Sequence, residues 1–531
     1  MKRDNNKWLR LKVMALALAV CIPAGAQTFN IENYSQTEQA LIWQNVWFGS
    51  TNPAAISLFN SMDDSSQMGE ATAGGKYSFG NFRSPYEPES GFGANLSTLS
   101  YIKLGKSVVK GHFGYNYDLS KGSTWRGLVD PHETPFMLAD SIPGNLSKET
   151  YSMGASIALP VGKRISFGIE AAYDVALMAK HVDLRNKNTR MDFYVAPGIR
   201  YDSRNFSAGI SARYRRSTEK IEYLQVDESS EKYLFEMMGA WNFRSMGFSS
   251  AETSRMKLGN AFGGSLQTEF KSNGNFRIYN EFSADYLTTT QGETGYNGLR
   301  HGDSRSLAFS DNITFVISPR RRITAFWKSA PMVGYRFIQR QELDPASGVR
   351  RYVTYGNPVP CFKRKEYEGG IFYDAPDTYL NNDATVTIRL AYGFEFGFLE
   401  EYYTEGIVRQ GSVDYDYIGP SLKILAGFKS RDGRHKIDIG AQATCNFRDP
   451  LTVDKERVYY GEMGMIEFTG DHYSSALARQ QGDVMHGIVA RGFAQWSHKQ
   501  FALRLNGYVR TPFKEKQKSY TTLALSTIYR F

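Results

Sequence analysis

The sequence predicts a transmembrane antiparallel β-barrel of about 14 to 18 strands, with 18 as the best estimate. Apolar and polar residues alternate with period two along most of the chain, and short turns alternate with long polar stretches. Aromatic residues make up 14% of the chain, with 33 Tyr and 34 Phe. A barrel strand alternates in this way because one face meets lipid and the other a polar lumen, with short periplasmic turns and long extracellular loops.

The first 26 residues have the pattern of a secretory signal peptide. Five basic residues between Lys2 and Lys12 precede the apolar run Val13 to Ile22, and Ala24-Gly25-Ala26 follows as a cleavage site. The apolar run is about half the roughly 20 residues that a spanning helix needs. We therefore expect cleavage after Ala26 and export to the cell outer membrane. Lipidation of Cys21 is not expected, because the bulky Val20 precedes it.

Charge and cysteine content exclude some classes of protein. The formal charge of +9 falls to +5 when residues 1–26 are removed, because five basic groups and one acid leave with them. This mild, dispersed charge does not fit a nucleic-acid binder. Cys361 and Cys445 remain, too few for a disulfide framework and without metal-ligand spacing. Whether the two thiols pair is left open.

Residues 27–67 differ from the rest and predict an N-terminal periplasmic or plug segment. Ser35-Gln36-Thr37-Glu38 has capping-box spacing and precedes an apolar run from Ala40 to Trp47, so we expect a short helix there. Pro53 then stops any helix. Trp43, Trp47, Asn52 and Pro53 are the candidate plug residues, and a periplasmic tail is the open alternative. The barrel is expected over 68–531.

Alternation predicts the strands of the barrel in pairs. The clearest single strand runs from Val386 to Phe398, and weak runs near Ala71 and Glu366 decide between 14, 16 and 18 strands. The predicted hairpins join 151–159 to 165–177, 191–201 to 206–214, 258–270 to 276–286, 307–317 to 323 onward, 418–428 to 437–447, and 488–496 to 501–509. Polar stretches at 119–148, 217–257, 338–364 and 448–484 are the expected extracellular loops.

The same parity predicts which charged residues line the lumen. The candidates carry both signs, which in a pore sets selectivity among polar solutes and in a plugged barrel forms salt bridges. They are Glu170, Asp174, Asp192, Arg200, Arg213, Glu269, Arg277, Glu281, Asp285, Arg389, Glu395, Lys423, Asp438, Arg491 and Arg504. A solvated or self-paired interior is the alternative interpretation. Asp311 falls on the apolar parity, for which a β-bulge is the expected explanation.

The chain ends on an alternating strand from Leu523 to Phe531. This strand resembles the C-terminal targeting strand of outer-membrane proteins. Its terminal Phe531, with Tyr529, is similar to the signal that the barrel-assembly machinery recognises. The resemblance implies that this machinery is a partner and outer-membrane lipid the surrounding medium.

Asn52-Pro53-Ala54 after a helix also resembles the start of the long-chain fatty-acid transporter barrels. In that family the N-terminal segment forms a hatch in the lumen, so the resemblance implies a hatch here. The whole chain more broadly resembles an uncharacterised family of Gram-negative outer-membrane β-barrel proteins, which implies fold and location but no substrate.

Few residues suggest catalysis, and no enzyme, metal or cofactor is predicted. The mature histidines show no H-x-x-x-H spacing, and no G-x-S-x-G element is present. Asp130-Pro131-His132-Glu133 and Asp471-His472 are the acid/His clusters expected on the outer side. Solvated loop residues explain both clusters more simply than an outer-membrane hydrolase does.

The leading functional prediction is a barrel that lets small solutes pass, either a channel or a hydrophobic-substrate transporter. A barrel of 16 to 18 strands is wide enough for an aqueous channel. The alternative is a surface-interaction or structural barrel with a sealed lumen, whose extracellular loops bind a partner protein or glycan. An outer-membrane partner protein is compatible with either prediction.

Overall fold

The protein is described by a computed structural model in which most of the barrel is placed. The described residues are 36–62, 66–227, 229, 232–239, 243–247, 252–272, 275–293, 299–318, 321–343, 345–346, 348–374, 378–379, 385–405, 408–430, 434–448, 452–453, 477, 479–480, 483–513 and 519–531. The expected signal peptide and Asp471-His472 lie outside them, as does most of the expected loop 448–484.

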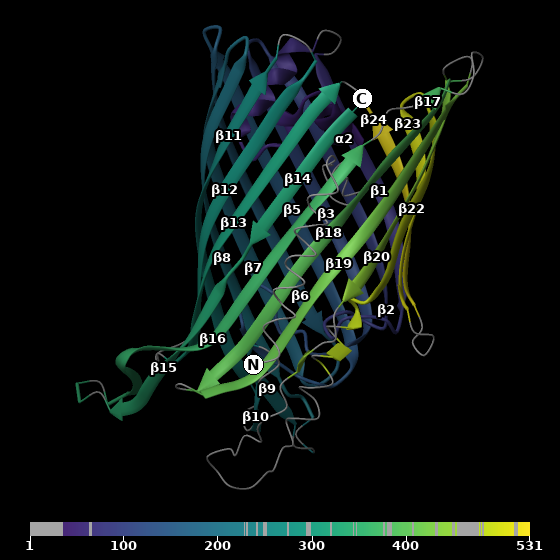
Figure 1. Cartoon of the computed structure of the whole chain (residues 1–531). Coiled ribbons are helices and arrows are strands. Elements are labelled where there is room, and N and C mark those ends of the chain that lie inside the picture. The colour runs from purple at the N-terminus through teal and green to yellow at the C-terminus, as the bar shows by residue number, and fades with distance from the viewer. Residues whose placement is uncertain are drawn as a thin grey trace, which may run out of the picture.

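Twenty-one of the described strands form one antiparallel sheet closed into a tall barrel (Figure 1). Its wall strands are β1 (Gln67–Gly80), β2 (Ser90–Leu104), β3 (Ser107–Ser123), β5 (Gly144–Val161), β6 (Ile165–Lys180), β7 (Arg185–Asp202), β8 (Phe206–Leu224), β11 (Glu252–Lys271), β12 (Arg277–Glu293), β13 (Arg300–Ser318), β14 (Arg321–Ser329), β15 (Met332–Leu343), β16 (Arg350–Asp374), β18 (Thr385–Glu405), β19 (Val408–Lys429), β20 (His435–Arg448), β22 (Gly487–His498), β23 (Phe501–Pro512) and β24 (Tyr520–Arg530). The two-residue strands β17 (Thr378–Tyr379) and β21 (Thr452–Val453) extend its ends.

The closed wall has 18 strands, as the sequence predicts. β14 and β15 count as one wall strand, because both pair with β13 on one side and β16 on the other. Ala330 and Pro331 interrupt this strand, since proline has no N–H to donate to the ladder. β1 pairs with β24 from Glu70↔Arg530 to Gly80↔Tyr520, which removes both free edges.

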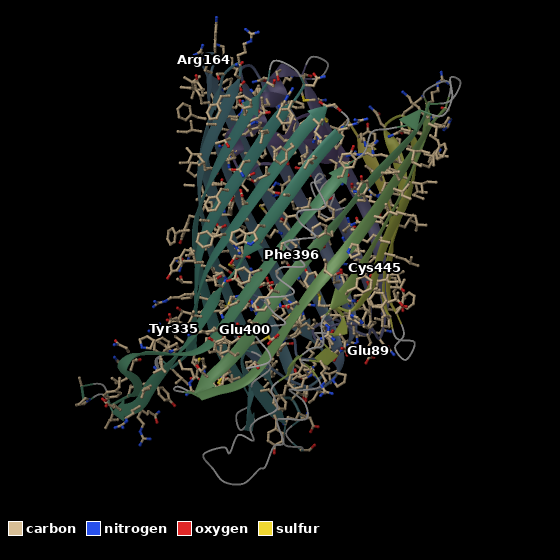
Figure 2. The ribbon with its side chains drawn as sticks, in the orientation of Figure 1. Glu89, Arg164, Tyr335, Phe396, Glu400 and Cys445 are labelled. Atoms are coloured by element: carbon tan, nitrogen blue, oxygen red, sulfur yellow. The ribbon has the colours of Figure 1, made fainter. Side chains whose placement is uncertain are left out.

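The pattern of exposure follows the predicted parity. Large apolar side chains such as Ile210 and Phe262 project outward and are exposed, whereas Ser211 and Glu269 point inward and are buried. Figure 2 shows these outward side chains around the wall, with Arg164 at one end and Tyr335 and Glu400 toward the other. We call the end near Arg164 the short-turn end and the opposite end the loop end. In an outer-membrane barrel these are the periplasmic and extracellular ends.

The weak runs near Ala71 and Glu366 are both strands, so the highest of the predicted strand counts, 18, is the observed one. Ala71 lies in β1 and Glu366 in β16. The predicted hairpins are present as neighbouring wall strands, each longer than predicted. β5, for example, has 18 residues, against roughly 9–11 needed to cross a membrane.

The boundaries predicted for the long loops were wrong. β3 and β5 extend into 119–148, β8 and β11 extend into 217–257, and most of 338–364 is a hairpin of β15 and β16. The strands continue past the membrane because backbone pairing needs no apolar face in water. Apolar and polar residues alternate less regularly there, so the sequence pattern does not predict these strand ends.

The bulge expected at Asp311 is absent. β12 and β13 keep one register from Arg277↔Val316 to Gln291↔Gly302, with Asp311 opposite Phe282. Asp311 therefore lies on the outward face. It accepts a hydrogen bond of 2.6 Å from the Asn280 amide, so a second polar residue, not a register shift, accompanies this break in the pattern.

Two inserts occupy the lumen. The N-terminal insert, residues 36–62, comprises α2 (Gln36–Gln44) and two 3₁₀ segments, η1 (Val46–Gly49) and η2 (Pro53–Ser61), near the short-turn end. The loop insert, residues 124–143, contains β4 (Phe136–Ala139), which joins β9 (Tyr233–Met238) and β10 (Phe243–Gly247) in a separate three-stranded sheet at the loop end. Among the described residues, no helix is long and apolar enough to cross a membrane.

Candidate functional site: two lumen inserts and the pocket beside one of them

Three inward glycines of the wall form the seat of the N-terminal insert. A Cβ at Gly168 would overlap the backbone nitrogen of Ala54 and lie 2.5 Å from the carbonyl carbon of Pro53. A Cβ at Gly198 would lie 2.9 Å from Pro53 Cδ, and one at Gly209 would lie 2.6 Å from the Asn52 amide nitrogen. Glycine permits this close approach because it has no side chain. The wall is therefore shaped to receive the start of η2.

Asn52 fixes the insert to this seat through its side chain. Its amide nitrogen donates to the Ile199 carbonyl at 2.9 Å and to Gln267 Oε1 at 3.0 Å. Its amide oxygen accepts from the Ala54 N–H at 3.0 Å, which caps η2. The residue is almost fully buried. With a further bond of 3.3 Å to the Ile210 carbonyl of β8, one amide side chain thus starts a helix and binds three wall strands.

Trp47 and Thr51 bind acidic groups of the wall. Trp47 Nε1 donates to Glu269 at 2.8 Å, and the Arg200 guanidinium lies 4.8 Å above the indole ring. The Thr51 hydroxyl donates to Glu281 at 2.6 Å, and its backbone N–H donates to the same oxygen at 2.9 Å. Three residues predicted to line the lumen therefore contact the insert.

Helix α2 is held at both ends by cations of the wall. Near its start, Glu38 forms an ion pair of 2.7 Å with Lys110. At its end, Arg322 donates to the carbonyls of Ile42 and Trp43. A cation at the last carbonyls of a helix is favourable because those acceptors lack partners within the helix. The guanidinium carbons of Arg322 and Arg389 lie 4.1 Å and 3.4 Å from the centre of the Trp43 ring.

An apolar contact completes the seat. Leu41, Ile56 and Phe59 of the insert are buried in one cluster with Leu99 and Tyr101 of the wall. The structure thus places all four candidate plug residues, Trp43, Trp47, Asn52 and Pro53, inside the barrel; their role there remains a prediction.

We expect Arg322→Ala to loosen α2, because the substitution removes both hydrogen bonds to its terminal carbonyls and the cation above Trp43. The measurement is limited chymotrypsin cleavage, since residues 36–62 offer Trp43, Trp47 and Phe48 but no Lys or Arg. Each hydrogen bond from a charged group is worth about 1.5–3 kcal/mol, so cleavage should accelerate at least about tenfold. Arg321→Ala is the matched control, because Arg321 is exposed on the neighbouring position. Equal cleavage of the two variants would contradict the assignment.

A buried charge network holds the loop insert. Glu133 of the insert lies 2.5 Å from Lys257 Nζ and 3.3 Å from Arg190, and Glu219 lies 3.3 Å from the same lysine. The Lys257 and Glu219 side chains are fully buried. Glu219 also accepts from the backbone N–H of Val129 at 2.8 Å. Wall charges at the loop end are therefore neutralised by the insert.

The loop insert also bridges separate parts of the wall. Its Leu138 belongs to one buried cluster with Tyr223 of β8 and Tyr415 of β19. The Tyr223 hydroxyl donates to the Leu138 carbonyl at 2.9 Å. Since β8 and β19 are not neighbours in the wall, the insert extends across the lumen.

Glu133 and His132 of the acid/His cluster 130–133 make contacts that hold the loop insert in place. Glu133 is engaged by Lys257 and Arg190, and the His132 ring packs edge-on against Tyr86 with centroids 5.4 Å apart. Burial lowers the pKa of His132, which favours its neutral form. In the part of the chain that the structure describes, no group of three or more His, Cys, Asp or Glu could hold a metal ion. Cys361 and Cys445 are free thiols.

Several lumen candidates pair with each other or with polar and charged residues outside the candidate list. Arg213 pairs with Asp285, and Asp192 lies 2.8 Å from Arg190 and 3.3 Å from Arg215. Asp174 accepts from Ser152, and Arg389 pairs with Asp374, which was not predicted. Part of the lumen is therefore self-paired, as the alternative interpretation holds.

Sequence analysis missed the network around Lys257 and the glycine seat. Lys257 and Glu219 fell in an expected loop, although the inward parity of β8 continues through Ser217, Glu219 and Ile221. Gly168, Gly198 and Gly209 fall on inward positions of three predicted strands. A set of glycines on one inner face is the signal that indicates a close neighbour.

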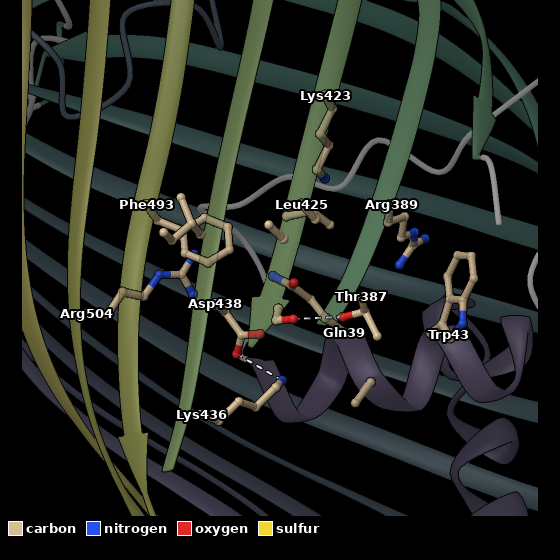
Figure 3. A pocket seen from close by; sticks show the side chains of 14 residues that line it. Gln39, Trp43, Thr387, Arg389, Lys423, Leu425, Lys436, Asp438, Phe493 and Arg504 are labelled. Atoms are coloured by element: carbon tan, nitrogen blue, oxygen red, sulfur yellow. Dashed lines mark hydrogen bonds and ion pairs between the residues drawn. The ribbon is translucent and has the colours of Figure 1, made fainter. Parts of the chain in front are cut away.

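A cavity of about 310 Å³ lies between α2 and the wall (Figure 3). Gln39, Ala40 and Trp43 of α2 form one side. The opposite side comprises Thr387, Arg389, Lys423, Leu425, Ala426, Gly427, Lys436, Asp438, Ile439, Phe493 and Arg504. Four predicted lumen residues, Arg389, Lys423, Asp438 and Arg504, thus meet at one place.

A protein-family model matches residues 53–530, nearly the whole barrel. The chain belongs to the family of unknown function DUF6850. The match begins at Pro53, in the seat of the N-terminal insert. No curated protein matches the chain.

Solved barrel structures cover most of this DUF6850 chain at low similarity. The ferric-catecholate import receptor Fiu from E. coli K12 has 9% identity and a TM-score of 0.37, covering 88% of this chain and 82% of its own. The siderophore receptor PiuA from Acinetobacter baumannii has 7% identity and a TM-score of 0.36, with coverage of 87% and 82%. None of these comparisons supports the resemblance to fatty-acid transporters.

Proposed function

We propose that this protein is an outer-membrane barrel through which small solutes pass and that its two inserts act as gates. The N-terminal insert occupies the short-turn end and the loop insert occupies the loop end. Both lie in the lumen of an 18-strand wall, a size class in which the interior is wide enough for an aqueous channel.

The observation that carries this proposal is that the seat holds the N-terminal insert mainly through polar contacts around three glycines. Asn52, Trp47 and Thr51 bind the wall through hydrogen bonds, and the β8–β11 ladder beside them is continuous. Polar contacts of this kind can be exchanged for water when a segment moves, at a net cost of about 1 kcal/mol for each neutral contact of Asn52 and about 1.5–3 kcal/mol for each contact of Trp47 or Thr51 with a carboxylate. A purely structural filler would have no need of a wall shaped by three glycines around one turn.

The test is single-channel recording in planar bilayers with four proteins: the wild type, two single deletions and the double deletion. One deletion removes residues 36–62, and the other replaces 124–143 by a four-residue Gly/Ser linker. The linker is short because Ser123 and Gly144 are already paired across β3 and β5. We expect discrete ohmic steps from the double deletion, because both ends of the lumen are then cleared, and small or rare steps from the wild type.

Silent bilayers from a correctly folded double deletion would overturn the proposal. They would favour a barrel that binds a partner at its surface. The observation in favour of that function is the hairpin formed by the outer parts of β15 and β16. Beyond Arg336 its two strands pair with each other, and Ile338 and Leu343 are exposed. Figure 1 shows this hairpin projecting sideways from the loop end.

A further inference from the structure

The cavity beside α2 has a marked excess of positive charge. Among its lining residues, Arg389, Lys423, Lys436 and Arg504 are cationic and Asp438 is acidic, a formal excess of +3. Asp374, which pairs with Arg389 from outside the lining, reduces the excess to +2. Lys436 lies 2.9 Å from Asp438, so these two charges largely cancel. Lys423 and Arg504 are the other two cations of the lining.

These two cations are withdrawn from bulk solvent. Lys423 and Arg504 are each 7% exposed, and they lie on the inner face of β19 and β23. Figure 3 shows the two side chains and Arg389 around the same space, with α2 on the opposite side. Water screens such charges less than it screens surface charges, so they interact strongly with an ion of opposite sign.

Apolar surface lies beside the cations. The Phe493 ring, the Leu425 side chain and the Trp43 ring all line the cavity. The guanidinium of Arg504 lies 4.3 Å from the centre of the Phe493 ring, which keeps its planar face in place. A ligand that suits this lining has an anionic head and a small apolar body. At about 310 Å³ the cavity is at the lower end of the range for small-molecule sites, roughly 300–1,000 Å³.

We propose that this cavity is a binding site for a small organic anion, one that carries a carboxylate or phosphate group on an aromatic or aliphatic body. Lys423 and Arg504 bind the anionic group, and Phe493, Leu425 and Trp43 contact the body. This inference rests on the proposed function, because it names the class of solute that the barrel takes.

The site is shared between the wall and the N-terminal insert. Gln39, Ala40 and Trp43 of α2 supply one side of the cavity, and the cations come from the wall. A ligand in the cavity therefore contacts the insert and the barrel together. Occupancy and the position of α2 are coupled for this reason, because only the seated insert completes the cavity.

The experiment is isothermal titration calorimetry on the full-length protein in detergent, with phenyl phosphate as the probe and phenol as the neutral comparison. We expect phenyl phosphate to bind and phenol to bind at least tenfold more weakly. Lys423→Gln and Arg504→Gln should each weaken phenyl phosphate about tenfold or more, because each removes a charge-assisted hydrogen bond. Lys328→Gln is the matched control. Lys328 lies on β14, in register with Glu368 of β16, and does not line the cavity.

The outcomes separate the two proposals. The anion site would be overturned if phenol and phenyl phosphate bind equally well. It would also be overturned if Lys328→Gln loses as much affinity for phenyl phosphate as Lys423→Gln and Arg504→Gln do. Neither result would bear on the bilayer recordings. No detectable binding of phenyl phosphate would also overturn the anion site. If Arg504→Gln fails to fold, Arg504→Lys keeps the charge and should bind within about tenfold of the wild type. If the full-length protein binds phenyl phosphate but the double deletion gives silent bilayers, the anion site stands and the transport function is overturned.

Discussion

Gly168→Ala should release the N-terminal insert from the barrel wall. The new Cβ would overlap the backbone nitrogen of Ala54 and approach the carbonyl carbon of Pro53 to 2.5 Å, and neither atom can rotate away as a flexible side chain can. Overpacking of this kind costs about 1–3 kcal/mol or more. We therefore expect chymotrypsin to cleave within residues 36–62 about ten to a hundred times faster than in the wild type.

The control for this variant is Gly259→Ala. Gly259 also lies on a wall strand, β11, but a Cβ there would meet its nearest neighbour, Ser217 Cβ, at 3.4 Å, an ordinary contact. Both substitutions change the intrinsic strand preference equally, so a difference between them reports the seat alone. If chymotrypsin cleaves residues 36–62 of Gly168→Ala as slowly as those of the wild type, the insert is not seated against this glycine.

Lys257→Met should release the loop insert. The lysine is fully buried between Glu133 and Glu219, so its loss leaves two buried carboxylates with less compensation; Arg190 and Arg215 still neutralise part of the charge on Glu133. Breaking a buried ion pair costs about 3–5 kcal/mol, and we expect the lower value here. Backbone amide exchange across 128–139 should then be about a hundredfold faster, as hydrogen–deuterium exchange with mass spectrometry would measure.

Lys220→Met is the comparison for Lys257→Met. Lys220 lies on β8, with a half-exposed side chain paired to Glu222. Exposed pairs of this kind contribute about 0–1 kcal/mol, so exchange across the loop insert should stay near the wild-type rate. If both variants exchange alike, the insert is held by the apolar cluster around Leu138 and Tyr223 and not by the charge network.

The wall could be predicted because its pattern is repeated in every strand. Alternation such as that in Val386–Phe398 reports a strand with one lipid face and one polar face, and this follows from the solvents on the two sides. The prediction failed at strand ends such as Lys257 and Glu219. There both faces meet water or an insert, and the apolar face that identifies a strand is no longer required.

The candidate site could be predicted only in part. Parity placed Arg389, Lys423 and Arg504 on the inner wall, and the structure brings them together at one cavity. Their meeting with Trp43 was not predictable, because contact across a lumen depends on which segment enters it. The pairing of Arg389 with Asp374 was missed for a related reason: the register between β16 and β18 follows from pairing along the whole strands.

The sequence by itself determined the fold class and the alternation of inward and outward residues, and it narrowed the strand count to between 14 and 18, because each depends on a local pattern of side chains; the structure gives 18. Only the tertiary structure decided that residues 36–62 and 124–143 lie in the lumen, and that Gly168, Gly198 and Gly209 form a seat for Pro53 and Asn52. The contacts of the seat join segments more than a hundred residues apart. No local pattern records them, because packing across a closed barrel is settled only when the wall has closed.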